Sequence, residues 1–289
     1  MDDWLSRFIA TERLPADFAD VARAVCAPLV ETILARRTGP GFVVGICGPQ
    51  ASGKSTLTAV LAAMLRARGL TAAVLSIDDL YLTRAERQVL AAEVHPLLAT
   101  RGVPGTHDVA LGEAVLEALK GRGEVALPRF DKACDDRAPL ADWPVAAAPV
   151  DVVLFEGWCV GATPEPPEAL ARPINALERD EDPDGAWRGF ANAALAGPYR
   201  RLFARIGLFV LLRPPGFEVV LGWRQEQERK LRERLAREGA GAGRAMSDVE
   251  VARFIAHYER ITRHILAEAP ARADVTIALD AQRRMIAPY

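Results

Sequence analysis

The sequence predicts an α/β fold in which helices cover both faces of a mostly parallel sheet. Short runs rich in β-branched residues alternate with longer segments of helical periodicity. Several of the short runs are continuously apolar, as strands buried on both faces are. The chain has 289 residues, of which 50% are hydrophobic and 26% charged, so it is long enough to bury a large core. We find no linker, and expect one domain with insertions.

The N-terminal third begins with a helical pattern. Residues 18–37 place apolar side chains on one face, and Thr38-Gly39-Pro40 ends the pattern. We therefore expect residues 1–40 to be an N-terminal helical segment ahead of a main domain at 41–289. The apolar run 42–47 predicts a buried parallel strand, and a helix follows at 53–68.

The middle of the chain predicts two more strands, at 70–77 and 150–155. Between them we expect helices at 83–99 and 109–120, followed by a mostly irregular stretch at 121–149 that is rich in proline and charge. We assign two insertions, at about 99–149 and 157–185, and we expect the second, which contains many prolines and acids, to be long and irregular. Long loops in compact domains often carry function.

The last part of the chain predicts a helix at 187–205, a strand at 206–212, a charged helix at 217–238, and a final strand at 275–279. Ser247-Asp248-Val249-Glu250 matches a capping box and should open another helix. The charged helix has a mixed pattern of charges that is typical of a solvated, salt-bridged face.

The overall charge and the cysteines exclude several classes of protein. The formal net charge is -2, so the surface as a whole is not built for nucleic acid or an anionic membrane. Four cysteines, Cys26, Cys47, Cys134 and Cys159, lack zinc-type spacing and predict reduced thiols. The N-terminus lacks a signal-peptide pattern, and no apolar run reaches the length of a membrane span. We expect a cytoplasmic protein without nucleic-acid or membrane partners. Its oligomeric state stays open.

Residues 48–55 match the phosphate-binding pattern G-x-x-x-x-G-K-[ST]. Gly48 and Gly53 should let the backbone curl so that its N–H groups point at phosphate oxygens. Lys54 supplies a cation to the β- and γ-phosphates, and Ser55 a hydroxyl to Mg²⁺. An ordinary glycine-rich turn is the alternative, but the motif follows a strand and opens a helix, as phosphate binding requires. We predict ATP and Mg²⁺ as ligands, with nucleotide contacts from Gly48, Pro49, Gln50, Ala51, Ser52, Gly53, Lys54, Ser55 and Thr56.

Carboxylates follow two of the predicted strands. Asp78 and Asp79 come after the second strand, and Glu156 ends the third. Ligands of open α/β sheets lie outside the carboxyl ends of the strands. Asp78 is a candidate to orient an attacking hydroxyl, and Glu156 a candidate to hold Mg²⁺ with Ser55. Asp79 is able to hold Mg²⁺ through water or to cap a helix, and capping alone is the alternative for both aspartates.

Further short strings stand out in and around these motifs: Leu75-Ser76-Ile77-Asp78-Asp79 before Tyr81-Leu82-Thr83, Arg101-Gly102, Gly105-Thr106-His107-Asp108, Leu127-Pro128-Arg129-Phe130-Asp131-Lys132 with Asp136-Arg137, Phe155-Glu156-Gly157-Trp158, Trp223-Arg224 with Gln227-Glu228, and Met246-Ser247-Asp248. With these strings the chain resembles the P-loop small-molecule kinases related to uridine kinase, phosphoribulokinase and pantothenate kinase. Within that group it most resembles the D-glycerate 3-kinase type. The resemblance runs from about Gly41 to the C-terminus.

The resemblance implies a P-loop NTPase-type sheet with strand order 2-3-1-4-5 and a mobile helical lid at about 217–245. It implies Asp78 as the base, beside catalytic Lys54, and a basic lid residue, for which we choose Arg224. It also implies substrate contacts, which we assign to Asp79, Tyr81, His107, Asp108, Arg129, Asp131, Lys132 and Arg137. Phe130 stands where relatives often have Tyr.

Several of these residues have a plainer interpretation. Asp108 is a good N-cap for the helix at 109–120, and the cations Arg129, Lys132 and Arg137 are also typical of a solvated loop. Their functional interpretation is carboxylate or phosphate binding, because an arginine fork matches a carboxylate.

The sequence therefore predicts an ATP-dependent kinase for a small hydroxylated metabolite, with D-glycerate as the favoured acceptor. A nucleoside, a pantothenate-like compound or another polyol is the alternative acceptor. A regulator that binds ATP without catalysis is the alternative from another class.

Overall fold

The computed structural model describes residues 2–11, 14, 18–237 and 245–286. Its centre is a six-stranded sheet in the order β10-β9-β8-β1-β7-β2. The strands are β1 (Phe42–Cys47), β2 (Ala72–Ser76), β7 (Val152–Gly157), β8 (Ile206–Arg213), β9 (Val275–Leu279) and β10 (Met285–Ile286). All neighbouring pairs are parallel except β9 and β10. Counted along the chain, the parallel strands follow the expected order 2-3-1-4-5, and the antiparallel β10 was not predicted.

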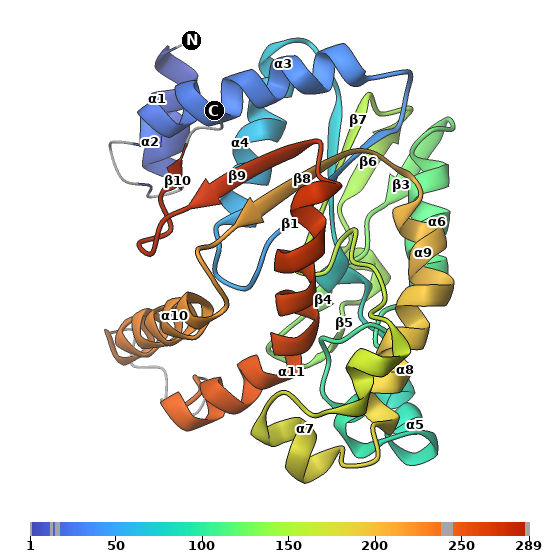
Figure 1. The fold of residues 1–289 in the computed structure, drawn as a ribbon. Coiled ribbons are helices and arrows are strands. Elements are labelled where there is room, and N and C mark those ends of the chain that lie inside the picture. The colour runs from blue at the N-terminus through green and yellow to red at the C-terminus, as the bar shows by residue number, and fades with distance from the viewer. Residues whose placement is uncertain (1, 12–13, 15–17, 238–244, 287–289) are drawn as a thin grey trace.

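Helices cover both faces of this sheet (Figure 1). One face carries α1 (Asp2–Thr11), α2 (Phe18–Val21), the π-helical turn η1 (Ala22–Cys26), α3 (Ala27–Arg36) and α4 (Lys54–Ala67). The other carries α6 (Val109–Ala118), α8 (Ala186–Ala194), η6 (Leu195–Tyr199), α9 (Arg200–Phe203) and α11 (Asp248–Glu268). The predicted helix at 18–37 is thus one helical run with a π-turn inside it.

The sheet separates two apolar cores. In β1, Val44 and Ile46 point into the core under α3 and α4, whereas Val43 and Cys47 point into the core under α6 and α11. Every residue of β1 is buried, which explains why its sequence is continuously apolar instead of alternating. The prediction of a sheet covered on both faces is confirmed.

Three predictions for the middle of the chain were wrong in part. The stretch 121–149 is not mostly irregular, because β3 (Gly123–Ala126) pairs with β6 (Val145–Ala148) and β4 (Phe130–Asp131) pairs with β5 (Asp136–Arg137). The helix expected at 83–99 is α5 (Arg84–Glu93) followed by the short η3 (Pro96–Ala99), since the residue before a proline is disfavoured in a helix. The insertion at 157–185 contains α7 (Ala176–Glu181) and a short η5 (Pro167–Ala171).

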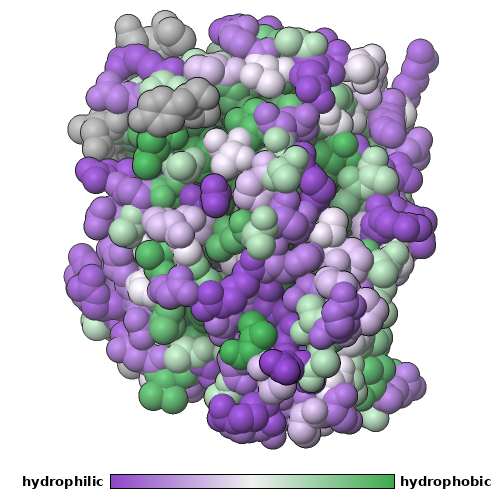
Figure 2. Space-filling model, viewed as in Figure 1, coloured by the Kyte–Doolittle hydropathy of each residue, from purple (hydrophilic) through white to green (hydrophobic). Residues whose placement is uncertain are grey.

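The predicted charged helix is α10 (Glu218–Arg237), and residues 238–244 of the expected lid lie outside the described residues. The capping box that opens α11 is confirmed. The side chain of Ser247 accepts from the N–H of Glu250, and the Glu250 carboxylate accepts from the N–H of Ser247. Over the described residues, no helix is both long and apolar enough to span a membrane. Figure 2 shows hydrophilic side chains gathered over the centre of the face that carries α11.

Candidate active site

The phosphate-binding motif forms the turn between β1 and α4. Ala51 and Gly53 both adopt left-handed backbone angles, with φ of 59° and 91°, and this conformation suits Gly53 because glycine lacks a Cβ. At Gly48 the structure gives a steric reason for glycine. A Cβ at Gly48 would lie 2.9 Å from the Cβ of Leu212 on β8. Glycine is therefore required there for close approach to the neighbouring strand.

A cavity of about 250 Å³ opens beside this turn, at the carboxyl ends of β1, β2 and β7. It joins segments that are far apart in the sequence. Its lining consists of Gln50, Ala51, Lys54, Ser55, Ser76, Asp78, Tyr81, Arg101, Lys132, Glu156, Gly157, Trp158, Arg224, Gln227, Phe254 and Tyr258. The structure thus brings together the predicted loop, base, metal ligands and lid residue.

Asp78 lies on η2 (Ile77–Leu80), the turn that follows β2. The hydroxyl of Tyr81 donates to Oδ1 of Asp78 at 3.0 Å, and Nζ of Lys132 donates to Oδ2 at 2.6 Å. Burial acts to raise the pKa of Asp78, but the nearby charge and hydrogen bond of Lys132 outweigh it, so the pKa lies below its ordinary value. The carboxylate is therefore ionised at neutral pH and able to accept a hydrogen bond.

Glu156 is the penultimate residue of β7 and lies beside Ser55. The Ser55 hydroxyl donates to Oε1 of Glu156 at 3.3 Å. Only 7% of the Glu156 surface is exposed, and this burial raises the pKa of its carboxyl group, while the Lys54 charge opposes the shift. Nζ of Lys54 donates to the Pro49 carbonyl at 2.9 Å. A hydroxyl beside a carboxylate is a suitable oxygen donor pair for a hard cation such as Mg²⁺.

Two residues of the same loop carry buried polar side-chain atoms that have no partner among the described residues. These atoms are Nε2 and Oε1 of Gln50 and Oγ of Ser52. Unsatisfied buried polar groups are rare and costly in folded proteins. Their position beside Lys54 and Ser55 fits a site that is completed by a polar, anionic ligand.

The remaining loop residues lie on the outer side of the turn. Ser52, Gly53 and Thr56 line a second hollow of about 940 Å³, together with the segment that joins β9 to β10. Arg283 of that segment donates to Glu226 of α10 at 2.6 Å. The indole N–H of Trp223 donates to the Ala281 carbonyl at 2.7 Å, so this segment and α10 are held together.

Arg224 reaches the cavity from α10. It donates to Oε1 of Gln227 at 2.6 Å and pairs with Glu228, a carboxylate that is 3% exposed. Its guanidinium lies 5.5 Å from the ring centre of Phe254 on α11. Phe254, Gln227 and Tyr258 are cavity residues that the sequence analysis did not select. Gln227 was visible in the sequence as part of the string Gln227-Glu228. Phe254 and Tyr258 lie on α11, whose helical pattern gives no sign of a site.

Several predicted substrate contacts do not line the cavity. Nη1 of Arg129 donates to Oδ2 of Asp79 at 3.2 Å, and Oδ1 of Asp79 accepts from the Phe130 N–H at 3.1 Å. Asp131 is exposed and accepts from the N–H of Ala133 at 2.8 Å, within the turn after β4. These contacts hold the β4–β5 hairpin against η2.

The segment before α6 is bonded in a similar way. Asp108 accepts from the N–H of Leu111 at 2.9 Å and from Nη2 of Arg137 at 3.1 Å, which makes it the N-cap of α6. Nδ1 of the buried His107 lies 2.6 Å from the Tyr199 hydroxyl, and its ring stacks on Tyr81 at 4.5 Å. Burial lowers the pKa of His107 to about 4, so it is neutral at pH 7 and supports Tyr81 from behind.

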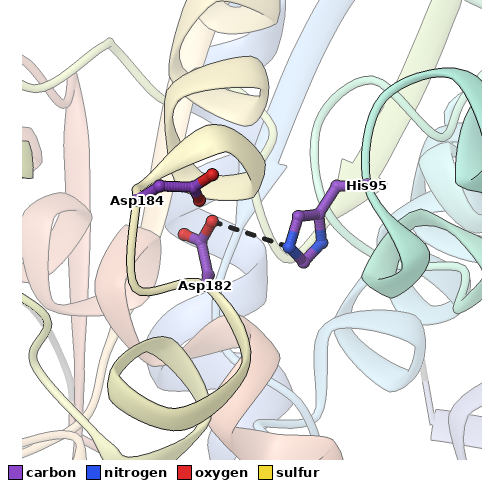
Figure 3. A group of neighbouring side chains, drawn as sticks. All are labelled: His95, Asp182 and Asp184. Atoms are coloured by element: carbon purple, nitrogen blue, oxygen red, sulfur yellow. Dashed lines mark ion pairs between the residues drawn. The ribbon is translucent and has the colours of Figure 1, made fainter.

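One group of metal-ligand type lies elsewhere, where His95 faces Asp182 and Asp184 (Figure 3). Its atoms are already engaged. Oδ1 of the fully buried Asp182 accepts from the N–H of Trp187 at 2.8 Å, and Oδ2 pairs with Arg188 at 2.9 Å. Nδ1 of His95 accepts from the Leu97 N–H at 3.2 Å. These contacts satisfy N–H groups at the beginnings of α8 and η3. The group therefore has a structural role.

The fold and the site together define a class of protein. A phosphate loop after the central strand of a 2-3-1-4-5 sheet, with carboxylates at the ends of the adjacent strand β7 and of β2 beyond it, is the arrangement of a P-loop kinase. A family model described as methylmalonyl Co-A mutase-associated GTPase MeaB matches residues 17–81, which hold the phosphate loop and β2.

Longer similarities define the family. The chain is 36% identical over 230 residues to the uncharacterized kinase mug58 of Schizosaccharomyces pombe, covering 76% of this chain and 79% of that one. It is 30% identical over 266 residues to the chloroplastic D-glycerate 3-kinase of Arabidopsis thaliana, covering 86% of this chain but 54% of the plant protein, about half its length. The solved D-glycerate 3-kinase of Cryptococcus neoformans superposes with a TM-score of 0.73 at 28% identity, covering 90% and 96% of the two chains.

The chain therefore belongs to the family of P-loop kinases that these relatives represent. It is a nucleotide-using small-molecule kinase.

Proposed function

We propose that the enzyme transfers the γ-phosphoryl group of ATP to the 3-hydroxyl group of D-glycerate and produces 3-phosphoglycerate. The bond between the γ-phosphorus and the β,γ-bridging oxygen breaks, a bond to the acceptor oxygen forms, and the hydroxyl proton leaves to a base. The observation that carries the proposal is the single cavity shared by Lys54, Asp78 and Lys132. The names of the plant and fungal relatives support the choice of acceptor.

The phosphate loop binds the nucleotide in this proposal. The loop N–H groups and Lys54 hold the phosphates, with help from the N-terminal end of α4. Ser55 and Glu156 hold Mg²⁺, which neutralises charge on the phosphates when it is bound. The outer hollow along Ser52, Gly53 and Thr56 receives the nucleoside, because it continues from the outer side of the loop.

Asp78 orients the acceptor hydroxyl and takes its proton. Each carboxylate oxygen has a second lone pair beside its hydrogen bond to Tyr81 or Lys132. Tyr81 and Lys132 contact the acceptor from the cavity wall. The other residues predicted to bind substrate, Asp79, His107, Asp108, Arg129, Asp131 and Arg137, act by holding the loops that shape this wall.

Arg224 acts from α10 as a lid residue that spreads charge off the transferring phosphoryl group. The position of Arg224 in the cavity wall, in the same lining as the phosphate loop residues Lys54 and Ser55, supports this role. Catalysis then comes mainly from positioning and electrostatic stabilisation, as in other phosphoryl transfers.

The proposal is tested by ADP release from Mg-ATP or Mg-GTP with D-glycerate, L-glycerate, uridine, pantothenate and glycerol. We expect turnover with ATP and D-glycerate, and a product identified by NMR as 3-phosphoglycerate. Turnover with uridine, pantothenate or glycerol instead would move the acceptor to one of the alternative classes. Tight ATP binding without turnover on any acceptor would favour the regulator.

A further inference from the structure

Arg101 is a cavity residue that the predicted site did not include. It follows η3 and lines the cavity that contains Asp78 and Lys132. Its side chain is 24% exposed and pairs through Nη1 with Asp135. Among the described residues this is the one side-chain partner of its guanidinium, which has five N–H donors. Donors therefore remain for a ligand in the cavity.

The position of Arg101 is determined by a second, fully buried arginine. Arg87 donates to the carbonyls of Leu82, Ala99 and Asp135 and pairs with Oδ2 of Asp135 at 3.0 Å. Asp135 sits in the β4–β5 turn with φ of 56° and holds Arg101 with its other oxygen. One carboxylate is thus shared by two guanidinium groups, and the cluster keeps a net positive charge at the cavity wall.

Aromatic rings connect this cluster to the proposed base. The Arg101 guanidinium lies 5.5 Å from the ring centre of Phe130, and that ring lies 5.2 Å from the ring of Tyr81, whose hydroxyl donates to Asp78. Tyr258 is close to both ends, because its hydroxyl lies 3.4 Å from the Arg101 carbonyl and its phenol is within reach of the Asp78 charge. Arg101 and Lys132 therefore stand on the Asp78 side of the cavity.

The other arginines near this wall are committed elsewhere. Arg129 pairs with Asp79 and Arg137 pairs with Asp108, and neither lines the cavity. Among the described lining residues, four are cationic, Lys54, Arg101, Lys132 and Arg224, against the two carboxylates of Asp78 and Glu156. The phosphate loop accounts for Lys54 and the lid for Arg224, which leaves Arg101 and Lys132 for a second anionic group.

We infer that Arg101 is the anchor for a carboxylate on the acceptor, with Lys132 beside it, and that Arg87 and Asp135 are positioning residues for that anchor. The inference rests on the proposed function and deepens it, because it restricts the acceptor to hydroxy acids and excludes neutral polyols and nucleosides. A planar guanidinium suits this task, since it binds a carboxylate through two parallel hydrogen bonds.

The test compares D-glycerate with its neutral amide, D-glyceramide, in the wild type and in Arg101→Gln. The wild type should prefer the acid. Arg101→Gln should raise the KM for D-glycerate by about 10- to 100-fold, the range for losing charged hydrogen bonds. The kcat/KM for the amide should fall much less, because a neutral amide makes only a weaker hydrogen bond to the guanidinium. Arg101→Lys should keep part of the preference. Asparagine tolerates the left-handed backbone at position 135, so Asp135→Asn should keep the turn. This variant should weaken the preference for the acid and change kcat less than it changes the KM for D-glycerate.

Three results of the comparison between D-glycerate and its amide would overturn the inference. The first is that Arg101→Gln keeps the preference for the acid over the amide. The second is that Arg101→Gln lowers the kcat/KM for the acid and for the amide by the same factor. The third is that Arg129→Gln, and not Arg101→Gln, removes the preference.

If the wild type does not phosphorylate D-glycerate, the proposed function fails. The same comparison is then made with pantothenate and its neutral alcohol, pantothenol. If the wild type prefers pantothenate and Arg101→Gln loses that preference, the role of Arg101 as a carboxylate anchor is supported. If the wild type phosphorylates neutral acceptors alone, that role is refuted. If no acceptor is phosphorylated, binding is measured instead. D-glycerate is titrated by calorimetry into the wild type and into Arg101→Gln, each with Mg²⁺ and a non-hydrolysable ATP analogue. Equal binding to the two proteins, or binding to neither, refutes the role of Arg101 as a carboxylate anchor.

Discussion

At the scale of single residues, the cavity places two carboxylates in opposite electrostatic surroundings. Burial dominates at Glu156 and raises its pKa, whereas at Asp78 the Lys132 contact outweighs burial and lowers the pKa. Environments that separate the pKa values of neighbouring acids are a frequent feature of active sites. In the proposed mechanism this division suits an ionised base on one side of the cavity and a metal ligand on the other.

Replacing Asp78 by Asn should abolish most of the turnover and leave nucleotide binding intact. Loss of a general base usually costs about 10² to 10⁴ in rate, and the Asn side chain keeps the shape of the carboxylate. Kinetics of ADP release and titration of ATP measure the two effects. Asp142→Asn, at an exposed position, is the matched control. Full activity in Asp78→Asn would show that the base assignment is wrong.

Removing the charge at position 132 should move the pH dependence of the enzyme. In Lys132→Met, the charge and hydrogen bond that oppose burial most strongly at Asp78 are lost, so the pKa of Asp78 should rise. The acid limb of the kcat/KM profile should then lie at higher pH.

The sign for stability follows from the same shift. A depressed Asp pKa contributes stability that is present above the unfolded-state pKa and is lost as the pH falls through the folded-state pKa. Lys132→Met should lose that contribution near neutral pH. An acid limb at the same pH in variant and wild type would contradict the role of Lys132.

At the scale of elements, the turn between β1 and α4 depends on close packing as well as on backbone conformation. Gly48→Ala would bring a methyl group within 2.9 Å of both the Leu212 Cβ and the Ser52 Oγ. Overpacking of this kind costs about 1 to 3 kcal/mol, and the shifted loop should also bind ATP more weakly. Urea unfolding and ATP titration measure the two losses.

A matched glycine is available for comparison with Gly48. Gly189 lies inside α8, and a Cβ there would meet no atom within 4 Å. Gly189→Ala should therefore stabilise the protein by about 0.5 to 1 kcal/mol through helix propensity. If Gly48→Ala is equally harmless, close approach to β8 is not the reason for glycine at that position.

At the scale of the whole molecule, the first forty residues carry no motif, but the helix α3 within them packs into the main core. Leu29, Val30 and Ile33 of α3 pack with residues of α4 and the sheet in one apolar cluster. This contact explains how a segment outside the resemblance supports the face of the sheet opposite α11. The boundary that we drew at residue 40 describes where the motifs start, and the packing crosses it.

Shortening a core side chain in this segment should lower stability without touching catalysis. Ile33 has no exposed surface, so Ile33→Ala should cost about 2 to 5 kcal/mol, while KM values stay as in the wild type. Thermal or urea unfolding measures the loss. Glu31→Ala, on the exposed side of α3, should cost much less, because its ion pair with Arg68 is solvent-exposed. A stable Ile33→Ala would mean that α3 contributes little to folding.

The sequence by itself determined the phosphate loop, the strands that flank it, the acids at the strand ends and the capping box at Ser247. Each of these depends on spacing over a few residues, and short-range spacing is visible in a sequence. Strand order was obtained only through the resemblance, because it depends on which strands pair across the chain.

Only the tertiary structure decided which side chains share the cavity. Arg129 and Arg101 look alike in the sequence, yet the first is paired with Asp79 away from the cavity and the second lines it. Tyr258 and Phe254 are recruited from the middle of α11, where their spacing shows core packing alone. The β4–β5 hairpin, whose strands are two residues long, has too few residues for a periodic signal and forms because η2 and Arg87 hold it. Partners brought from segments far apart in the chain leave no local pattern, so these choices depend on the fold.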